Sequence, residues 1–580
     1  MALGGGVMRQ SRRRVTRDPH FHRSGMSPGA AHPLSNTREK RIMACKLLRS
    51  AYVAAALVAA DAACANEGLV QLGNVGAEPA TTRDAPPVVK RTAGDKTKGK
   101  TEAAPTANKA APAAPWGPVL TDNISLANLA PGLLVYFNNG PVFGLPGTVT
   151  GDIAQRTQLL GDWGGTRTEL ARHGFFFDLY STSYYQNVTS GGLKTGEAFV
   201  QNTQVSVNID TGRAGWWSGG LIHVTAQSRL GDTAASTFTA GTVVPQYTGL
   251  VLPGPMESNS FLLSEYFLVQ ALSKQASVVV GKISDVFIPD QTAFGDAFKY
   301  YFANFNFNKN PITTNFYNPT ALGALGVWAF SPKFVIAGGV LDPYTQATSI
   351  AEPNSFDKVN IYLTAIISYD IGGLPGQFSP AYNWSNKPKI DLEDPFGRLS
   401  SPAAATQAIG SLLGLASSEG LPANFKDDSW FVLANVSQYM FVKDDAETVA
   451  RKLKTGEPIR GIGAFARVGY APEETNPITQ DFSLALFAYG LLDQREYDSF
   501  GIGLYYNKIS DNLKSSIATI SQGQAAAHDE SGMEVFYNFA ITPAVRLIPS
   551  YQHIWHPLAA EVADRQDSAD IFQLRLTTAW

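Results

Sequence analysis

The chain is poor in charge and in cysteine, and it has no long apolar runs. Charged residues make up 16% of its 580 residues, whereas soluble globular domains carry about 25%. No apolar stretch reaches the roughly 20 residues that a transmembrane helix needs, which excludes a helical membrane protein. The two cysteines, Cys45 and Cys64, are too few for a disulfide scaffold or a cysteine-rich metal site.

Aromatic residues and glycine are abundant instead. Aromatic side chains make up 11% of the chain, and there are 53 glycines. The hydrophobic content of 44% is enough to bury a large core, which excludes a disordered chain. This composition favours an all-β protein.

The N-terminal part predicts export. Lys46 and Arg49 precede an apolar run at residues 51–60 and a small-residue cleavage site at residues 63–65, so residues 43–65 are typical of a secretory signal peptide. We expect Met43 to be the true start, with residues 1–42 an upstream extension, and both cysteines to leave with the signal. Residues 66–115 are rich in Ala, Pro and Lys and predict a disordered linker.

From residue 175 to the end, apolar and polar residues alternate with a period of two, which indicates β-strands with one apolar face and one polar face. In the last segment, Phe572, Leu574 and Leu576 share one face, while Gln573 and Arg575 share the other. About sixteen segments follow this rule, and the alternation is poorest in 376–385: 176–187, 198–210, 220–230, 262–271, 275–284, 324–331, 333–341, 358–370, 376–385, 429–441, 460–471, 481–490, 499–508, 530–541, 544–555 and 569–580.

The connections between these segments alternate in length. Short ones, such as 331–332 and 542–543, alternate with long ones, such as 231–261, 285–323, 386–428 and 509–529. An outer-membrane barrel has short periplasmic turns, long outer loops and an even number of strands. We therefore predict an all-β, transmembrane antiparallel β-barrel of about 16 strands over residues 175–580. The long connection 442–459 breaks the pattern, and its stretch 444–454 predicts a periplasmic helix.

Two further segments carry expectations. Trp580 is an aromatic residue ending an amphipathic last strand, so we expect the barrel-assembly machinery to recognise it. The connection 386–428 is apolar in places (AAATQAIGSLLGLASSEGL); it could fold inward as a plug or constriction, or lie at the surface as a loop.

Residues 159–192 carry the most specific string, LLGDWGGTRTELARHGFFFDLYSTSYYQNVTSGG. It resembles the opening signature of the carbohydrate-selective porins of the OprB type, and weaker similarity extends over residues 150–580. The resemblance implies an outer-membrane barrel that passes sugars such as glucose. Residues 116–174 are then a periplasmic segment with a short helix over 167–172. We expect the glycine-rich motif to cap the periplasmic mouth rather than contact solute: Gly161, Asp162, Trp163, Gly164 and Gly165.

A sugar channel requires hydroxyl partners on its inner wall. Charged side chains cost little on the pore face, whereas Arg or Lys at mid-bilayer on the lipid face costs about 2–4 kcal/mol. Strand parity therefore selects pore-lining candidates, which could form a constriction of opposed Arg and Glu: Arg229, Glu265, Arg467, Glu534, Arg546, Arg575, Gln227 and Asn202.

Other functions remain as alternatives. Residues 116–580 hold 28 basic and 41 acidic side chains, which disfavours an anion channel and leaves a general or cation-preferring porin open. A barrel hydrolase would need a histidine beside a carboxylate, and no Gly-x-Ser-x-Gly or His-Glu-x-x-His motif occurs. We expect sugars, outer-membrane lipid and the assembly machinery as partners, with no nucleic acid, cofactor or metal. Both a monomer and a homotrimer are open.

Overall fold

A computed structural model of the chain describes residues 119–121, 124–125, 149–231, 239–244, 260–284, 299–316, 320–346, 349–455 and 458–580. All the described residues belong to the unit Ala104–Trp580. The expected upstream extension (1–42), signal peptide (43–65) and linker (66–115) all lie outside the described residues.

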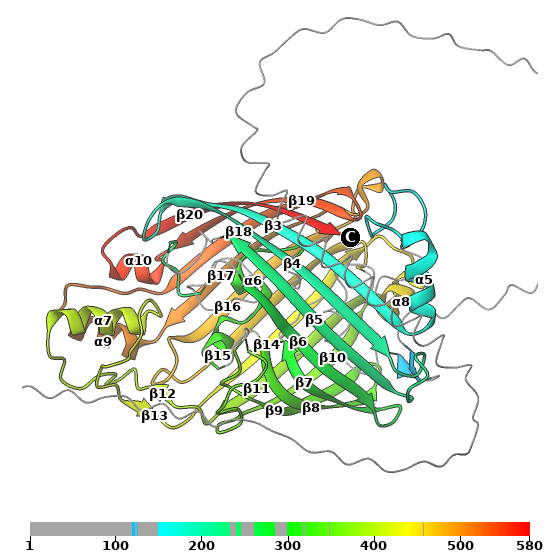
Figure 1. Cartoon of the computed structure of the whole chain (residues 1–580). Coiled ribbons are helices and arrows are strands. Elements are labelled where there is room, and N and C mark those ends of the chain that lie inside the picture. The colour runs from blue at the N-terminus through cyan, green and yellow to red at the C-terminus, as the bar shows by residue number, and fades with distance from the viewer. Residues whose placement is uncertain are drawn as a thin grey trace, which may run out of the picture. The chain divides into compact units, whose positions relative to one another are not determined.

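Sixteen antiparallel strands close into one barrel, which confirms the predicted fold class (Figure 1). Each strand pairs with its neighbours in chain order, and β20 pairs with β3 to close the ring. The strands are β3 (Phe175–Gly191), β4 (Gly196–Asp210), β5 (Gly220–Gly231), β6 (Ser260–Ala271), β7 (Ala276–Ser284), β8 (Thr320–Ser331), β9 (Phe334–Leu341), β10 (Asn360–Ile371), β11 (Leu374–Ser385), β14 (Ser429–Val442), β15 (Gly461–Tyr470), β16 (Ile478–Tyr489), β17 (Ser499–Ile509), β18 (Glu530–Thr542), β19 (Val545–Trp555) and β20 (Ser568–Ala579).

The two faces of the barrel differ as the alternation predicts. In β20, Phe572 and Leu576 are exposed, whereas Gln573, Arg575 and Thr577 are buried. The same pattern of exposed apolar and buried polar residues runs through β17 and β18. An apolar outer face and a polar inner face are the arrangement that a bilayer requires of a barrel. Within the described ranges, no helix is long and apolar enough to cross a membrane.

The long connections carry helices at one end of the barrel: α7 (Pro402–Leu412), α9 (Asp511–Ile520) and α10 (Leu558–Val562). The opposite end holds α5 (Thr166–Arg172) and α8 (Ala446–Thr455), which agrees with the helices predicted over 167–172 and 444–454 (Figure 1). Short strand pairs lie outside the ring: β1 (Val119–Thr121) with β2 (Ile124–Ser125), and β12 (Lys389–Ile390) with β13 (Phe425–Lys426).

The apolar part of segment 386–428 forms helix α7, which packs against α9 at the long-loop end. Ala408 and Leu412 are buried in a cluster that also contains Leu513 and Ile517 of α9. Packing between two outer loops therefore accounts for the apolar run. This arrangement agrees with the surface-loop alternative. A different segment lies against the inner wall, as described below.

The motif at Gly161–Gly165 holds the ends of the first and last strands together. Gly161, Gly164 and Gly165 have φ values of 65°, 66° and 93°, a region that glycine adopts most easily. The resulting turn leads into α5, whose buried Arg167 donates to the backbone oxygens of Phe177 at 2.8 Å and Trp580 at 3.3 Å. The motif thus closes the seam between β3 and β20 at the short-turn end.

Candidate pore-lining site

A segment of the connection between β7 and β8 lies against the inner wall. Residues 299–316 contain a short helix, α6 (Phe305–Asn308), and a 3-10 turn, η4 (Pro311–Asn315). Asn304 and Asn310 cap these two elements by accepting the backbone N–H of Asn306 at 2.9 Å and of Ile312 at 3.1 Å. We call residues 299–316 the inner segment.

Three of the predicted pore-lining residues bind the backbone of the inner segment. The carboxylate of Glu534, which is fully buried, accepts the N–H of Ala303 at 2.8 Å and of Asn304 at 2.8 Å. Arg575 donates to the carbonyl oxygen of Tyr301. Arg467 donates to the carbonyl oxygens of Phe307 and, at 3.2 Å, of Asn308. These charged groups therefore hold the inner segment in place through its backbone.

Aromatic rings fill the space behind these bonds. Phe302 and Phe307 are fully buried, and their ring centroids lie 4.7 Å apart. Phe302 also meets Phe536 of β18 at 4.8 Å, edge to face, a favoured geometry for aromatic pairs. A Cβ at Gly501 would lie 2.7 Å from Phe302, and one at Gly503 would lie 2.5 Å from Phe307. Glycine at these two inward positions of β17 therefore gives the rings their room.

Polar contacts extend the anchoring along the wall formed by β16–β20. They are Asn304 to Gln552 (3.0 Å), Asn507 to Asn306 (3.0 Å), Asn538 to the oxygen of Tyr300 (3.0 Å), Thr577 to the oxygen of Lys299 (2.9 Å), and Asn310 to Asp481. Arg546, a fourth predicted residue, stacks over Tyr300 at 4.8 Å and donates to the oxygen of Tyr497 at 2.8 Å.

The other four predicted residues lie on β4–β6, across the ring from β14–β16. Asn202 donates to Gln227 at 2.9 Å, and Gln227 donates to Ser264 at 3.0 Å. Arg229 stands directly opposite Asn202 in the β4–β5 register. It is 6% exposed, and its Nε and Nη1 have no hydrogen-bond partner. Two buried N–H-bearing atoms of this side chain therefore lack an acceptor, which is costly in free energy.

Glu265 sits at a bulge in β6, where the register shifts between Thr225 and Ala226. Its carboxylate lies 3.4 Å from Nε2 of the fully buried His223. His223 also contacts Asn208 and Thr225, each at 2.7 Å, and stacks on Phe267 with ring centroids 4.6 Å apart. This network, which the sequence did not predict, fixes the wall beside the amides of Asn202 and Gln227.

The closed ring of sixteen strands, with its apolar outer face and its polar inner wall narrowed by an inward segment, defines a channel of the porin class. The model of the carbohydrate-selective porin family, OprB, matches residues 194–579. The chain belongs to this family and is an outer-membrane porin for carbohydrates. The motif at Gly161–Gly165 precedes the matched residues.

Several known proteins are similar to this chain. Porin B of Pseudomonas aeruginosa is 21% identical over 465 residues, which cover 73% of this chain and 91% of that protein. The high-pH structure of Pseudomonas putida OprB superposes with a TM-score of 0.58 at 16% identity, covering 74% of this chain and all of that one. The low-pH structure of the same protein has a TM-score of 0.43 at 15% identity, covering 74% of this chain and 99% of that one.

Proposed function

We propose that the barrel passes neutral monosaccharides, such as glucose, or small oligosaccharides between the inner segment and the wall formed by β4–β6. The observation that carries this proposal is Arg229, a buried guanidinium with two N–H-bearing atoms that lack partners. Asn202 and Gln227 place amides beside it. Guanidinium and amide groups are the donors and acceptors that sugar hydroxyls require, and a single row of them binds weakly enough to release the solute.

The remaining expectations are part of the same proposal. We infer that residues 43–65 export the chain to the periplasm of a Gram-negative cell and that Trp580 marks it for the assembly machinery. In support of a marker role, Trp580 lies at the end of the amphipathic β20, where its indole N–H donates to Ser181 at 2.9 Å.

The test uses single channels of the refolded protein in planar bilayers, with glucose added and the blocked fraction measured. Arg229→Gln keeps a polar side chain but removes the charged fork. A hydrogen bond to a charged group contributes about 1.5–3 kcal/mol, so we expect the half-blocking glucose concentration to rise roughly tenfold or more. Arg172→Gln, at an exposed arginine of α5, is the control and should leave the block unchanged. Equal block in both variants would remove Arg229 from the sugar path.

The second candidate, a cation-preferring diffusion porin, is favoured by the excess of acidic over basic residues in 116–580. Reversal potentials across a salt gradient separate the two. A carbohydrate path predicts weak ion selectivity together with block by sugar. Strong cation selectivity without block by sugar would favour the general porin instead.

A further inference from the structure

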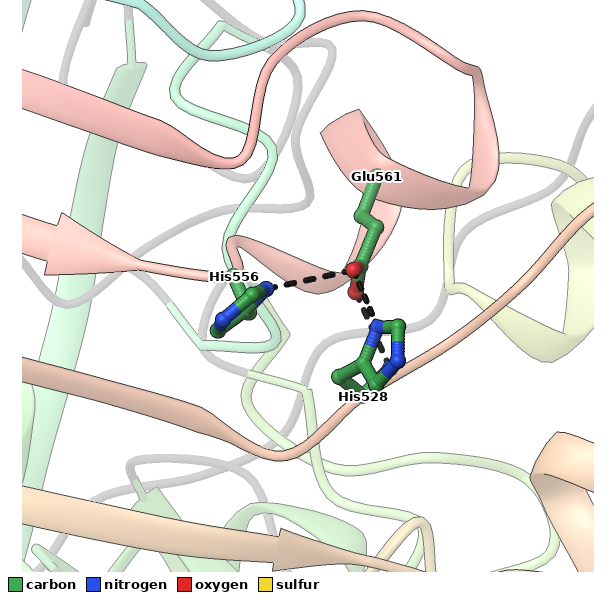
Figure 2. A group of neighbouring side chains, drawn as sticks. All are labelled: His528, His556 and Glu561. Carbon is green, nitrogen blue, oxygen red and sulfur yellow. Dashed lines mark hydrogen bonds and ion pairs between the residues drawn. The ribbon is translucent and has the colours of Figure 1, made fainter.

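Two histidines and a glutamate meet in the loops at the long-loop end of the barrel (Figure 2). His528 lies in the connection between α9 and β18. His556 directly follows β19, and Glu561 lies in α10. One nitrogen from each histidine and one oxygen from the glutamate all lie within 4.8 Å of one another. We call these three residues the loop triad.

Both imidazoles face the same carboxylate oxygen. Nδ1 of His556 lies 3.2 Å from Oε1 of Glu561, and Nδ1 of His528 contacts the same oxygen. The other oxygen, Oε2, accepts the backbone N–H of His528 at 2.9 Å. Figure 2 shows the two rings converging on the carboxylate from different chain segments. His556 has a φ of 53°, an uncommon conformation for a residue other than glycine.

Burial divides the triad into a fixed group and two adjustable ones. The Glu561 side chain is 8% exposed, whereas those of His528 and His556 are 62% and 43% exposed. Zinc binds imidazole nitrogens and carboxylate oxygens at about 2.0–2.2 Å, so its ligands stand roughly 3.3 Å apart. The distance between His556 and Glu561 already has this size, and the exposed rings can turn to complete the geometry. The backbone N–H that binds Oε2 orients the ligating carboxylate, as partners of metal ligands do.

We propose that the loop triad binds one divalent transition-metal ion of the zinc class through two imidazoles and one carboxylate. Hard cations such as Mg²⁺ and Ca²⁺ prefer sets made only of oxygen ligands, whereas imidazole suits zinc, copper and nickel. Three protein ligands leave the fourth position of a tetrahedral ion to water. The site is independent of the sugar path and concerns the outer loops alone.

Such an ion would brace the mouth of the channel. It would join the connection before β18 to the connection between β19 and β20. The same α10 holds a third segment, because the N–H of Ala559 donates to the oxygen of Gly241 at 2.7 Å. Glu530 at the start of β18 also accepts the N–H of Val243 at 2.8 Å. Metal at the triad would therefore reduce the motion of three loop segments together.

The test is a titration of the refolded, untagged protein in detergent with Zn²⁺, followed by calorimetry, and with Co²⁺, followed by its visible absorption. We expect one tight site per chain, with absorption bands typical of a tetrahedral cobalt site. His528→Gln can still donate a hydrogen bond to Glu561, but it no longer supplies an imidazole. Its affinity should fall at least about tenfold, the loss that removing even an outer partner of a metal ligand produces. His556→Gln, the second variant, should behave in the same way.

His173→Gln provides the matched control, because His173 also faces a carboxylate, that of Glu169 at 3.4 Å. No second histidine joins that pair within the described residues, so this variant should bind Zn²⁺ like the unchanged chain. The second readout is channel noise, which Zn²⁺ added on the loop side should reduce in the unchanged chain and not in His528→Gln. Equal Zn²⁺ affinity in all these proteins, or no saturable binding, would overturn the proposal.

Discussion

Releasing the inner segment from the wall should widen the channel, and Glu534→Ala is the sharpest way to do so. The Glu534 carboxylate accepts the backbone N–H groups of Ala303 and Asn304, and both residues are buried. The substitution deprives two amide groups of their acceptor, at a cost of about 1–3 kcal/mol each. Even at the low end of about 2 kcal/mol in total, the ratio of docked to released segment falls roughly thirtyfold, since about 1.4 kcal/mol corresponds to a factor of ten.

The assay is single-channel conductance in planar bilayers, with glucose block as a second readout. We expect larger steps and weaker block in Glu534→Ala, because a released segment no longer narrows the lumen. Glu534→Gln retains one acceptor oxygen and should give an intermediate result. Glu447→Ala, at an exposed position of α8, controls for the loss of a carboxylate elsewhere. Unchanged conductance and block in a correctly folded Glu534→Ala would show that the segment does not narrow the path.

Three further predictions concern packing, closure and pH. Gly503→Ala places a Cβ 2.5 Å from the ring of Phe307. This overlap should displace the inner segment, which raises the conductance, and lower the stability of the fold by about 1–3 kcal/mol. Gly326→Ala is the control and should change neither quantity, because its Cβ would have no neighbour closer than 3.9 Å. Arg167→Ala removes the bonds to the backbone oxygens of Phe177 and Trp580. A hydrogen bond that involves a charged group contributes about 1.5–3 kcal/mol, so the variant should lower the temperature at which the barrel unfolds on a heated gel. An unchanged temperature would refute the closing role of Arg167. Burial, reinforced by the charge of Lys387, lowers the pKa of Lys389 from 10.5 to about 7. Between pH 7 and pH 10.5, the folded chain therefore binds fewer protons than the unfolded chain, and the stability of the fold rises with pH. Proteolysis within 386–428 should therefore be slower at pH 9 than at pH 7, and Lys389→Met should abolish the difference.

The sequence predicts the barrel well because strands in a bilayer obey a local rule. Each residue faces either lipid or the interior, so a period of two marks every strand and the last one is placed to within a residue. The weakest segment, 376–385, forms β11 (Leu374–Ser385) despite Pro375, Gly376 and Pro380. Proline cannot donate to a ladder and is rare in paired strands, which explains why the pattern there was poor.

The inner segment could not be placed in the same way, because its position depends on contacts between residues far apart in the chain. Strand parity selects Glu534 and Arg575 as inward residues, but it cannot show that a loop from residues 299–316 binds them. Two local signals were available. Asparagines alternate along residues 304–310, and Gly501 and Gly503 leave an inward gap on β17. Together they indicate that a segment with alternating asparagines and aromatic residues packs against that wall.

The inner segment also divides the barrel into two regions with different mutational tolerance. On β15–β20, substitutions of inward residues must preserve the hydrogen bonds and ring contacts to the inner segment. We therefore expect few substitutions to be tolerated there. On β4–β6, the hydrogen bonds that link Asn202, Gln227 and Ser264 join neighbouring strands of the wall to one another, and Arg229 lies opposite Asn202 in the register. Changes on these three strands could redirect the channel to a new solute while leaving the loop, and with it the bore, as it is. Libraries aimed at altered transport are therefore best confined to this side of the ring.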